Sequence, residues 1–464
     1  MLPSNFFLTL SLCLSFFNAL SVNITQSSHA LSFDQEKLVF SLRNIQNAGY
    51  YFVMRVGEPF FNNVFEILLD ISNPWTWIPD YSCSNCFRTN LHSTYYNCEE
   101  NSKTCHQNED KGAVTLNYPY GSIVAISGTD LIGLPSLPLN SSIQHTIGYA
   151  IEVTKDFYDM DADGILGLGI SNGASETGLH SILNKLFEQK WIEKRIFSLF
   201  LTHDPDQEDN LSELEFGGFN LSRIVDNEIL QTSPVANPNF WSFKLNNLKL
   251  VPFEMGEIDL KISSREVMLS TTFPDVGIPQ AEFSNLIQVF KNLDIECSET
   301  KFFSNYICTC PNNDVSKFPE LVFQLENAIL KLPNRIYMSI LGKNIYDESG
   351  NVIFKKYQNC VLGFRSIGKH ELDEKFGEIW IFGMSIMRYY YTIFDMDNMV
   401  ISFAPAKGSN LTENLTFPQL IWVQVLIILF LIAACSWILY KGCITARRWK
   451  RRGSETLSHY ISVS

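Results

Sequence analysis

The sequence has little positive charge for its length. Its 464 residues hold 35 Lys and Arg against 49 Asp and Glu, which gives a formal net charge of −14. Residues 441–464 contain six Lys or Arg and one Glu, or +5, so the first 440 residues sum to −19. Nucleic-acid binding depends on clustered cations that displace phosphate counterions, so this acidic body predicts no nucleic-acid partner.

Long amphipathic helices are also scarce. Most of the chain consists of short runs rich in β-branched and aromatic residues, separated by Gly, Pro, Asn and Asp, which is typical of strands and turns. Two segments have helical spacing of apolar residues, 176–189 and 282–293. The pattern predicts a mostly β protein with one or two helices in each half.

Only two apolar runs are long, and they lie at the two ends. Residues 1–21 hold an apolar run that ends in Ala19-Leu20-Ser21, which predicts a signal peptide, with an uncleaved anchor as the alternative. Residues 420–440 carry no charge and are followed by the basic cluster of 441–464. This predicts one C-terminal transmembrane helix with a cytosolic tail, rather than a buried core helix. We therefore expect a single-pass type I membrane protein of the secretory pathway or cell surface.

Glycosylation sequons and cysteines agree with this orientation. All six N-x-S/T sequons precede the predicted span: Asn23, Asn140, Asn210, Asn220, Asn410 and Asn414. Apart from Cys13, Cys435 and Cys443, the cysteines form two clusters of four: Cys83, Cys86, Cys98 and Cys105, then Cys297, Cys308, Cys310 and Cys360. Two even clusters in an oxidising compartment predict two lobes with two disulfides each, whose connectivity the sequence leaves open. Zinc at the Cys83-x-x-Cys86 pair is the alternative.

Several motifs in fixed order resemble the pepsin family of aspartic endopeptidases. They are YYFVMRVG at 50–57, FEILLDISNPWTWIP at 65–79, DGILGLG at 163–169, EFGG at 215–218 and WIFGMSIMRYYYTIFDMDNMVISFAPA at 380–406. The resemblance covers residues 50–406 and implies a bilobal, mostly β pepsin-like fold with a central cleft that binds a peptide or protein. It also implies a flap above the cleft, with Tyr118 as the flap tyrosine, and scaffold glycines at Gly167 and Gly383. The predicted C-terminal anchor is similar to that of membrane-bound members.

The two catalytic positions depart from the family pattern. The family uses two Asp-Thr/Ser-Gly turns, whose carboxylates share one proton and act as general base and general acid. Here the first turn is Asp70-Ile71-Ser72, and the resemblance places Ser270-Thr271-Thr272 at the second. The second aspartate is therefore Ser270, and both turn glycines are replaced. We reject Asp275 as a substitute, because it lies five residues beyond the turn position.

Two other motifs favour different chemistry. Gly169–Gly173 matches the G-x-S-x-G nucleophile elbow, and His180, His203 and His370 are the candidate bases, but the alternating βα pattern of such hydrolases is missing. Residues 159–170 begin like an EF-hand loop and end in Ile170, where calcium binding needs a Glu. We expect no metal and no cofactor.

The sequence thus predicts a membrane-anchored pseudo-peptidase that binds peptides or proteins. The alternatives are an active aspartic endopeptidase with an atypical dyad and a structural surface glycoprotein. The predicted organisation is a signal peptide (1–21), a short propeptide or N-terminal strand (22–49), an N-terminal lobe (50–235), a C-terminal lobe (236–406), a glycosylated stalk (407–419), a transmembrane helix (420–440) and a cytosolic tail (441–464).

Overall fold

The computed structural model describes residues 37–408 with gaps. The chain divides into two units, Met1–Glu36 and Lys37–Ser464, and all described residues belong to the second. The gaps are 46–48, 59–62, 84, 87–94, 109, 111, 119–120, 136, 138–140, 158–161, 172–180, 203–211, 227, 229, 254, 300–305, 342, 347–351 and 368–377.

Several predictions therefore fall outside the described residues. They include the signal peptide, the span at 420–440, the cytosolic tail and the sequons at Asn23, Asn140, Asn210, Asn410 and Asn414. Within the described part of the chain, no helix has the length and apolar character needed to cross a membrane.

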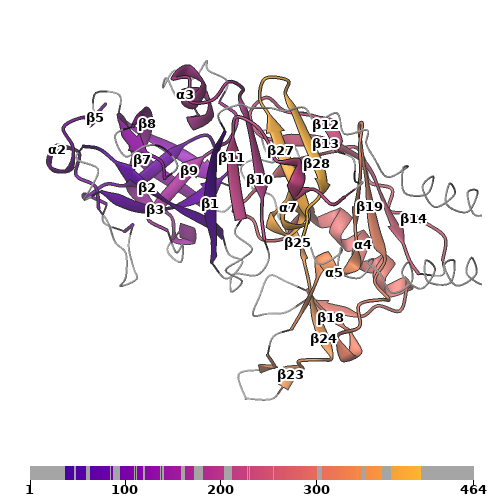
Figure 1. Cartoon of the computed structure of the whole chain (residues 1–464). Helices are drawn as coiled ribbons and strands as arrows, with labels where there is room; N and C mark the ends of the chain where they lie inside the picture. Colours follow the sequence, from indigo (N-terminus) through magenta and orange to yellow (C-terminus); the bar gives the residue numbers. More distant parts are fainter. Residues whose placement is uncertain are drawn as a thin grey trace, which may run out of the picture. The chain divides into compact units, whose positions relative to one another are not determined.

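Strands dominate the described structure, as the sequence predicts (Figure 1). Among the described residues the largest sheet has 14 strands, in the order β12-β28-β27-β10-β11-β1-β2-β3-β9-β4-β8-β7-β5, with β6 paired to β7. Its strands are β1 (Leu38–Ile45), β2 (Gly49–Val56), β3 (Val64–Asp70), β4 (Thr76–Pro79), β5 (His106–Gln107), β6 (Ala113–Tyr118), β7 (Gly121–Gly133), β8 (Ile143–Val153), β9 (Gly164–Gly167), β10 (Ile196–Phe200), β11 (Ser212–Phe216), β12 (Gln231–Pro234), β27 (Tyr390–Asp395) and β28 (Val400–Pro405).

The second half of the chain forms further sheets. An eight-stranded sheet has the order β20-β19-β13-β15-β26-β16-β25, with β14 paired to β13, and two smaller sheets follow the orders β17-β18-β24-β21 and β22-β23. These strands are β13 (Ser242–Val251), β14 (Ile258–Asp259), β15 (Arg265–Leu269), β16 (Val276–Pro279), β17 (Cys297–Glu299), β18 (Tyr306–Thr309), β19 (Glu320–Leu325), β20 (Ile329–Leu332), β21 (Met338–Ile340), β22 (Ile345–Tyr346), β23 (Val352–Phe354), β24 (Asn359–Leu362), β25 (Phe364–Ile367) and β26 (Trp380–Phe382).

The α-helices are few and short. They are α2 (Cys98–Asn101), α3 (Ile182–Glu188), α4 (Gln280–Asn292), α5 (Asn334–Tyr337) and α7 (Met384–Tyr389). The helix predicted at 282–293 is confirmed as α4, which buries Phe283, Leu286 and Phe290. The helix predicted at 176–189 corresponds to α3, which spans Ile182–Glu188 among the described residues. The Ser181 side chain caps the N-terminus of α3.

Aromatic packing joins the two halves of the chain. Phe197 of β10 stacks on Phe394 of β27, with ring centroids 4.5 Å apart. Trp241 contacts both rings, at 5.8 and 5.2 Å. Its indole N–H also donates to Leu168 O, across 2.9 Å. Because all three rings are fully buried, each of them stabilises the fold through large apolar area and directed ring contacts.

Four disulfides confirm the prediction of two within each cysteine cluster. The pairs are Cys83–Cys86, Cys98–Cys105, Cys297–Cys308 and Cys310–Cys360. Cys83 is bonded to Cys86, so the structure does not support the zinc alternative for that pair. Within the described ranges, no cluster of three or more His, Cys, Asp or Glu residues is arranged to hold a metal ion.

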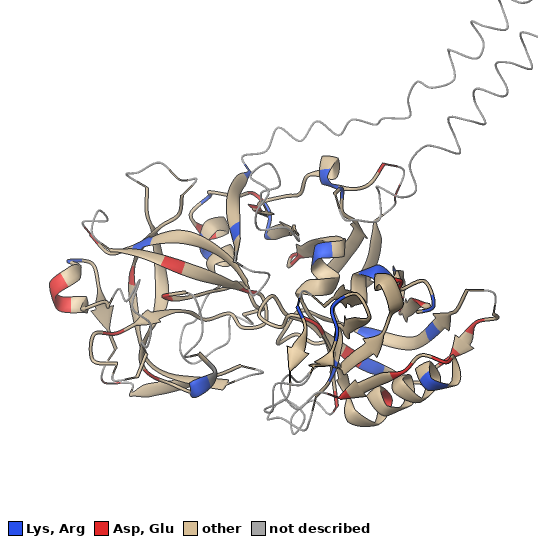
Figure 2. Cartoon of the chain, turned by 90° about the horizontal axis from the view of Figure 1, so that it is seen from below, with Lys and Arg blue, Asp and Glu red and all other residues tan. Residues whose placement is uncertain are grey.

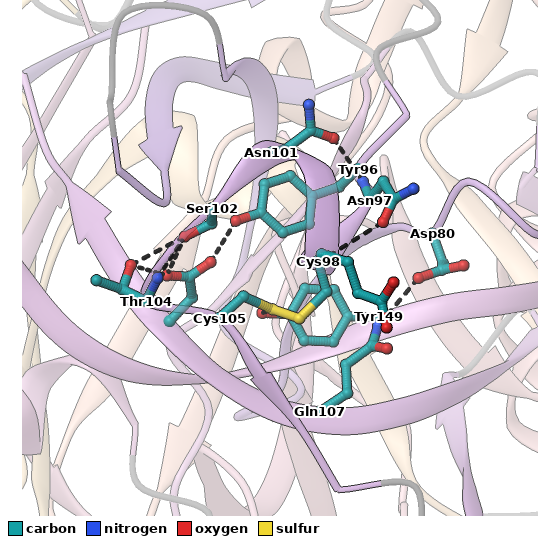
Figure 3. Close-up of a disulfide and its surroundings, with 12 residues drawn as sticks. Asp80, Tyr96, Asn97, Cys98, Asn101, Ser102, Thr104, Cys105, Gln107 and Tyr149 are labelled. Carbon is teal, nitrogen blue, oxygen red and sulfur yellow. Dashed lines mark hydrogen bonds between the residues drawn. A yellow bond between two sulfur atoms is a disulfide. The ribbon is translucent and has the colours of Figure 1, made fainter.

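The Cys98–Cys105 disulfide lies among polar side chains in the first half of the chain (Figure 3). The Tyr149 hydroxyl is 3.2 Å from Cys105 Sγ, and the Tyr149 ring stacks on Tyr96 at 5.7 Å. Tyr96 donates to the carboxylate of Asp130, which also accepts from nearby hydroxyls. Asp130 is 1% exposed, and these donors satisfy a carboxylate that would otherwise be costly to bury.

We predict that the disulfides contribute unequally to stability. Cys310–Cys360 joins residues 50 apart, whereas Cys83–Cys86 joins residues three apart. The chain-entropy relation gives about 4 kcal/mol for the long loop and about 2 kcal/mol for the short one. Urea unfolding of the two double Cys→Ala variants should show this order. Equal losses would contradict it.

Charged residues of both signs are interspersed over the described strands and helices (Figure 2). Of the six sequons, Asn220 is the one that the structure describes. Its side chain accepts from Ser222 N and caps the short 3₁₀ helix at Leu221–Arg223. Glycosylation at this position stays a prediction.

Candidate functional site

Asp70 ends a buried strand. Strand β3 buries Phe65, Ile67 and Leu69, and it pairs in parallel with β9, so that Asp70 lies opposite Gly167. The side chain of Asp70 has no exposed surface. Ser72 donates twice to Asp70 Oδ1, from its backbone N at 2.8 Å and from its hydroxyl at 2.6 Å. Asp70 Oδ2 has no hydrogen-bond partner among the described residues.

Burial has the largest effect on the pKa of Asp70. Removal from water raises the pKa of this carboxyl from 3.8 to about 6, while the hydroxyl and N–H of Ser72 and the N–H of Asn73 lower it. No charged neighbour contributes to this pKa shift. Asp70 is therefore a lone carboxyl that titrates between neutral and mildly acidic pH.

Ser270 occupies the corresponding place in the second half. It follows strand β15, which pairs in parallel with β26, and its backbone N donates to Phe382 O at 3.0 Å. Its side chain is fully buried. The Ser270 hydroxyl accepts from Thr272 N at 3.3 Å and lies 3.0 Å from the Thr272 hydroxyl. The turn thus has the same local form as the Asp70 turn, but it contains no carboxylate.

Thr271 connects the two turns. Its hydroxyl donates to Leu69 O at 2.7 Å and accepts from Ile71 N at 3.2 Å. Ile71 has no hydroxyl to make the reciprocal contact. Thr271 therefore supplies the side-chain half of the connection between the two turns.

The two scaffold glycines make close approaches to the backbone. A Cβ on Gly167 would lie 2.4 Å from Pro74 C, and one on Gly383 would lie 2.1 Å from Phe273 O. The backbone of Gly383 also donates to Asp275 O at 2.9 Å. Both positions therefore require glycine. Gly167 packs against the backbone that follows the Asp70 turn, and Gly383 packs against the backbone that follows the Ser270 turn.

Tyr118 lies at the end of β6, in the hairpin that β6 forms with β7. The ring is 7% exposed and makes an edge contact with Phe157 at 5.3 Å. Asn73, three residues after Asp70, donates from Nδ2 to Asn117 O at 3.2 Å. This hydrogen bond places the β6–β7 hairpin beside the Asp70 turn, where the resemblance expects a flap.

Asp275 forms an ion pair with Arg365. Arg365 donates from Nε to Asp275 Oδ2 at 2.8 Å, and its second nitrogen contacts the same oxygen. The guanidinium also lies over the Phe273 ring, 5.6 Å from its centroid. This ion pair occupies the Asp275 carboxylate, in agreement with the expectation that Asp275 is not a second acid beside Asp70.

The other motifs do not form a site in the described structure. Ile170 and Gly169 belong to the chain after β9, where Gly169 N donates to Asn73 O at 3.1 Å. The candidate histidines His180, His203 and His370 lie outside the described residues, as do residues 159–161 of the EF-hand-like segment.

Sequence reasoning missed the role of Ser72. It treated Ser72 only as a Cβ in place of a glycine, whereas its hydroxyl and N–H are the two donors to Asp70 Oδ1. The Asp-x-Ser spacing was the available signal, because an Asp carboxylate commonly accepts hydrogen bonds from the residue two positions later.

We predict that alanine is not tolerated at the scaffold glycines. Gly167→Ala and Gly383→Ala force a Cβ into backbone atoms, and each should cost about 3 kcal/mol or more. Gly256 is a matched control, because a Cβ there meets nothing within 4 Å. Thermal unfolding checks this, and the prediction is wrong if all three variants melt together.

We also predict that Asp70 destabilises the protein at neutral pH. Its pKa is about 6 in the folded protein and 3.8 as the ordinary value, so the folded state holds the proton more tightly. Stability from this group is complete below pH 4 and is lost as the pH rises through 6, by about 3 kcal/mol. Asp70→Asn should therefore be about 3 kcal/mol more stable than the natural protein at pH 7.5 and equal to it near pH 3.5. Denaturant unfolding at both pH values measures this, and a difference that does not depend on pH would refute it.

Comparisons with known proteins agree with this geometry. The family described as "Eukaryotic aspartyl protease" matches residues 49–406. Similar proteins include Cathepsin E-B of Xenopus laevis, 24% identical over 78% of this chain and 81% of the relative. Plasmepsin VII of Plasmodium falciparum (isolate NF54) is 26% identical over 77% of this chain and 78% of the relative. Pepsin A of Gallus gallus is 22% identical over 78% of this chain and 86% of the relative. These matches confirm the resemblance found in the motifs, and the chain belongs to the pepsin-type, eukaryotic aspartyl protease family.

Proposed function

We propose that this protein is a membrane-anchored pseudo-peptidase that binds peptides or proteins in the pepsin-type site without cleaving them. The observation that carries the proposal is the fully buried Ser270, at the turn position that matches Asp70. The family reaction needs a base and an acid at the same time, and two coupled carboxyls supply both.

A serine hydroxyl cannot take the role of the missing acid. It does not ionise near neutral pH, and it carries no charge that could shift the proton affinity of Asp70. The pKa of Asp70 is raised by burial and by no neighbouring charge, in contrast to a pair in which one carboxylate acts on the other. Loss of one general acid or base costs about 10²–10⁴ in rate.

The architecture around the turns supports a binding role. The Thr271 hydrogen bonds, the close approaches at Gly167 and Gly383, and the hairpin with Tyr118 are all present. These features hold a peptide-binding framework in the family, and the relatives named pepsin and cathepsin match across most of their length. A purely structural glycoprotein would not need them.

The proposal includes the membrane topology that the sequence predicts. Residues 1–21 direct the chain into the secretory pathway, 420–440 anchor it, and 441–464 lie in the cytosol. The four disulfides support an oxidising compartment for the ectodomain. The lobes are assigned to 50–235 and 236–406, joined to the anchor by a glycosylated stalk at 407–419. Strand β1 favours the N-terminal-strand interpretation for Leu38–Ile45, because it pairs with both β2 and β11.

A second candidate is an active endopeptidase with an atypical dyad. The observation that favours it is the presence of a buried Asp70 with a raised pKa next to the Thr271 contact. In that case Asp70 alone would act as base, and the reaction would need another acid that the described site residues do not supply.

We predict that restoring the second carboxyl restores cleavage. The full-length protein and its Ser270→Asp variant are incubated with a broad peptide library between pH 3 and 7, and products are identified by mass spectrometry. Ser270→Asp should cleave at least about 10²-fold faster than the natural protein, because it regains a general acid. Ser270→Asn is the matched control, since it has the shape of Asp without the acid, and it should stay at background.

The result that would overturn the proposal is cleavage by the natural protein. Such turnover counts only if pepstatin inhibits it and Asp70→Ala abolishes it. That outcome would establish the second candidate and require another acid near Ser270.

A further inference from the structure

Among the described disulfides, Cys83–Cys86 closes the smallest loop. Its cysteines are three residues apart, whereas those of the other pairs are 7, 11 and 50 residues apart. In the chain-entropy relation the stabilisation from a disulfide grows with the loop that it closes, so this bond contributes least to the stability of the fold. Cys83–Cys86 is therefore the disulfide that can open and close at the lowest cost to the folded state.

The two sulfurs of this disulfide differ in burial. Cys83 is 5% exposed. Cys86 is half-buried, at the edge of an apolar cluster that includes Ala150 and Val153 of β8. Thiol–disulfide exchange depends on the access of a thiolate to one of the two sulfurs. An incoming thiol therefore reaches Cys86, and Cys83 is the sulfur that leaves.

Each sulfur already has an oxygen acceptor for the thiol that reduction would form. Asn85 Oδ1 lies 3.7 Å from Cys83 Sγ, and Ala150 O lies 3.8 Å from Cys86 Sγ. A thiol S–H is a weak donor that can use such acceptors. The reduced pair would thus leave no S–H donor without a partner, which removes one cost of opening the bond.

The other disulfides lack this combination of features. Cys310 and Cys360 are 1% and 0% exposed. Cys297 and Cys308 lie directly opposite each other in the pairing of β17 with β18, and Cys308 has no exposed surface. Cys105 has the Tyr149 hydroxyl 3.2 Å from its sulfur. In the part of the chain that the structure describes, an acceptor for both sulfurs is found at Cys83–Cys86 alone.

Asn85 holds the short loop in place between the two cysteines. Its Nδ2 donates to Val153 O at 2.9 Å, and its Oδ1 accepts from Val153 N at 3.1 Å. The backbone N of Cys83 also donates to Asp80 O at 3.0 Å. None of these hydrogen bonds uses the S–S bond, so they can persist after reduction. They keep the two sulfurs close together, which favours reclosure of the disulfide.

We propose that Cys83–Cys86 is a thiol-exchange site, at which Cys86 takes up a small thiol as a mixed disulfide and Cys83 resolves it. The thiolate of the small thiol attacks Cys86 Sγ, so that a new S–S bond forms there and the bond to Cys83 breaks. Cys83 leaves as a thiolate and takes a proton from water.

The mixed disulfide has two outcomes. The Cys83 thiolate can attack Cys86 Sγ, which expels the small thiol and closes the original bond. Alternatively, a second small thiol can attack the first one and release Cys86 as a thiol. The second route oxidises two small thiols to their disulfide, and the two electrons reduce Cys83–Cys86. This inference goes beyond the proposed function, because it needs neither peptide binding nor cleavage.

The experiment follows each cysteine of the full-length protein in detergent micelles, with glutathione as the small thiol. The protein is incubated at pH 7.5 with increasing concentrations of reduced glutathione and quenched with acid. Free thiols are then alkylated with N-ethylmaleimide, and the peptides are identified by mass spectrometry. The Cys83–Cys86 bond should be lost first, with glutathione on Cys86 and maleimide on Cys83. Cys310–Cys360 should stay intact, and the circular dichroism of the protein should not change.

Two single variants test which sulfur receives the thiol. They are incubated with oxidised glutathione, which transfers one glutathione to a free thiol. Cys83→Ser should accumulate a lasting glutathione adduct on Cys86, because the resolving thiol is missing. Cys86→Ser is the matched control. It leaves the buried Cys83 as the free thiol, which should carry little adduct.

Three results would overturn the proposal. In the first, another disulfide opens before Cys83–Cys86 or together with it. In the second, Cys83–Cys86 opens only when the circular dichroism shows that the protein unfolds. In the third, the two single variants carry equal amounts of adduct. If the variants do not fold, the order of opening in the natural protein decides the question by itself.

Discussion

The contact between the two site turns is the interaction on which the rest of the site depends. Thr271, from one half of the chain, donates to Leu69 O and accepts from Ile71 N of the other half. All of these groups are buried, so an unmade bond would leave unsatisfied polar atoms in the interior. The contact fixes the ends of β3 and β15 together, and that in turn fixes where Asp70 and Ser270 lie.

This constraint explains how the scaffold persists without the second acid. The features that hold the turns are the Thr271 hydroxyl, the bare backbones of Gly167 and Gly383, and the Trp241 contact to Leu168 O. None of them needs a carboxylate at position 270. A serine at position 270 buries no charge, and burying a charge is costly. The non-cleaving site that we propose is therefore physically compatible with these contacts.

Much of the fold followed from the sequence, because its signals are local or strongly ordered. Short runs of β-branched and aromatic residues predicted a mostly β fold, the spacing of apolar residues predicted α4, and even cysteine clusters predicted two disulfides each. The turn at Ser270 was located because its strand, its proline and its helix keep the family order. The predictions at the two ends of the chain stay predictions, since they lie outside the described residues.

The details of the site were harder to foresee, because they depend on contacts between distant segments. The backbone N–H of Ile71 donates to the Thr271 hydroxyl, 200 residues away in sequence. The position of Ser72 showed a missing glycine and did not show that its hydroxyl would hold Asp70 Oδ1. The ion pair of Asp275 with Arg365 spans 90 residues. Pairing of this kind is set by the tertiary fold and leaves no pattern in a single sequence.

The central claim is that the site contains one carboxyl that titrates alone. The most direct test is an NMR titration of protein labelled with ¹³C at the aspartate carboxyls, compared with its Asp70→Asn variant. The account predicts one signal that is missing in the variant and that follows a simple one-proton curve with a pKa of about 6. A site signal with two coupled steps would reveal a second acid sharing its proton, and it would contradict the account.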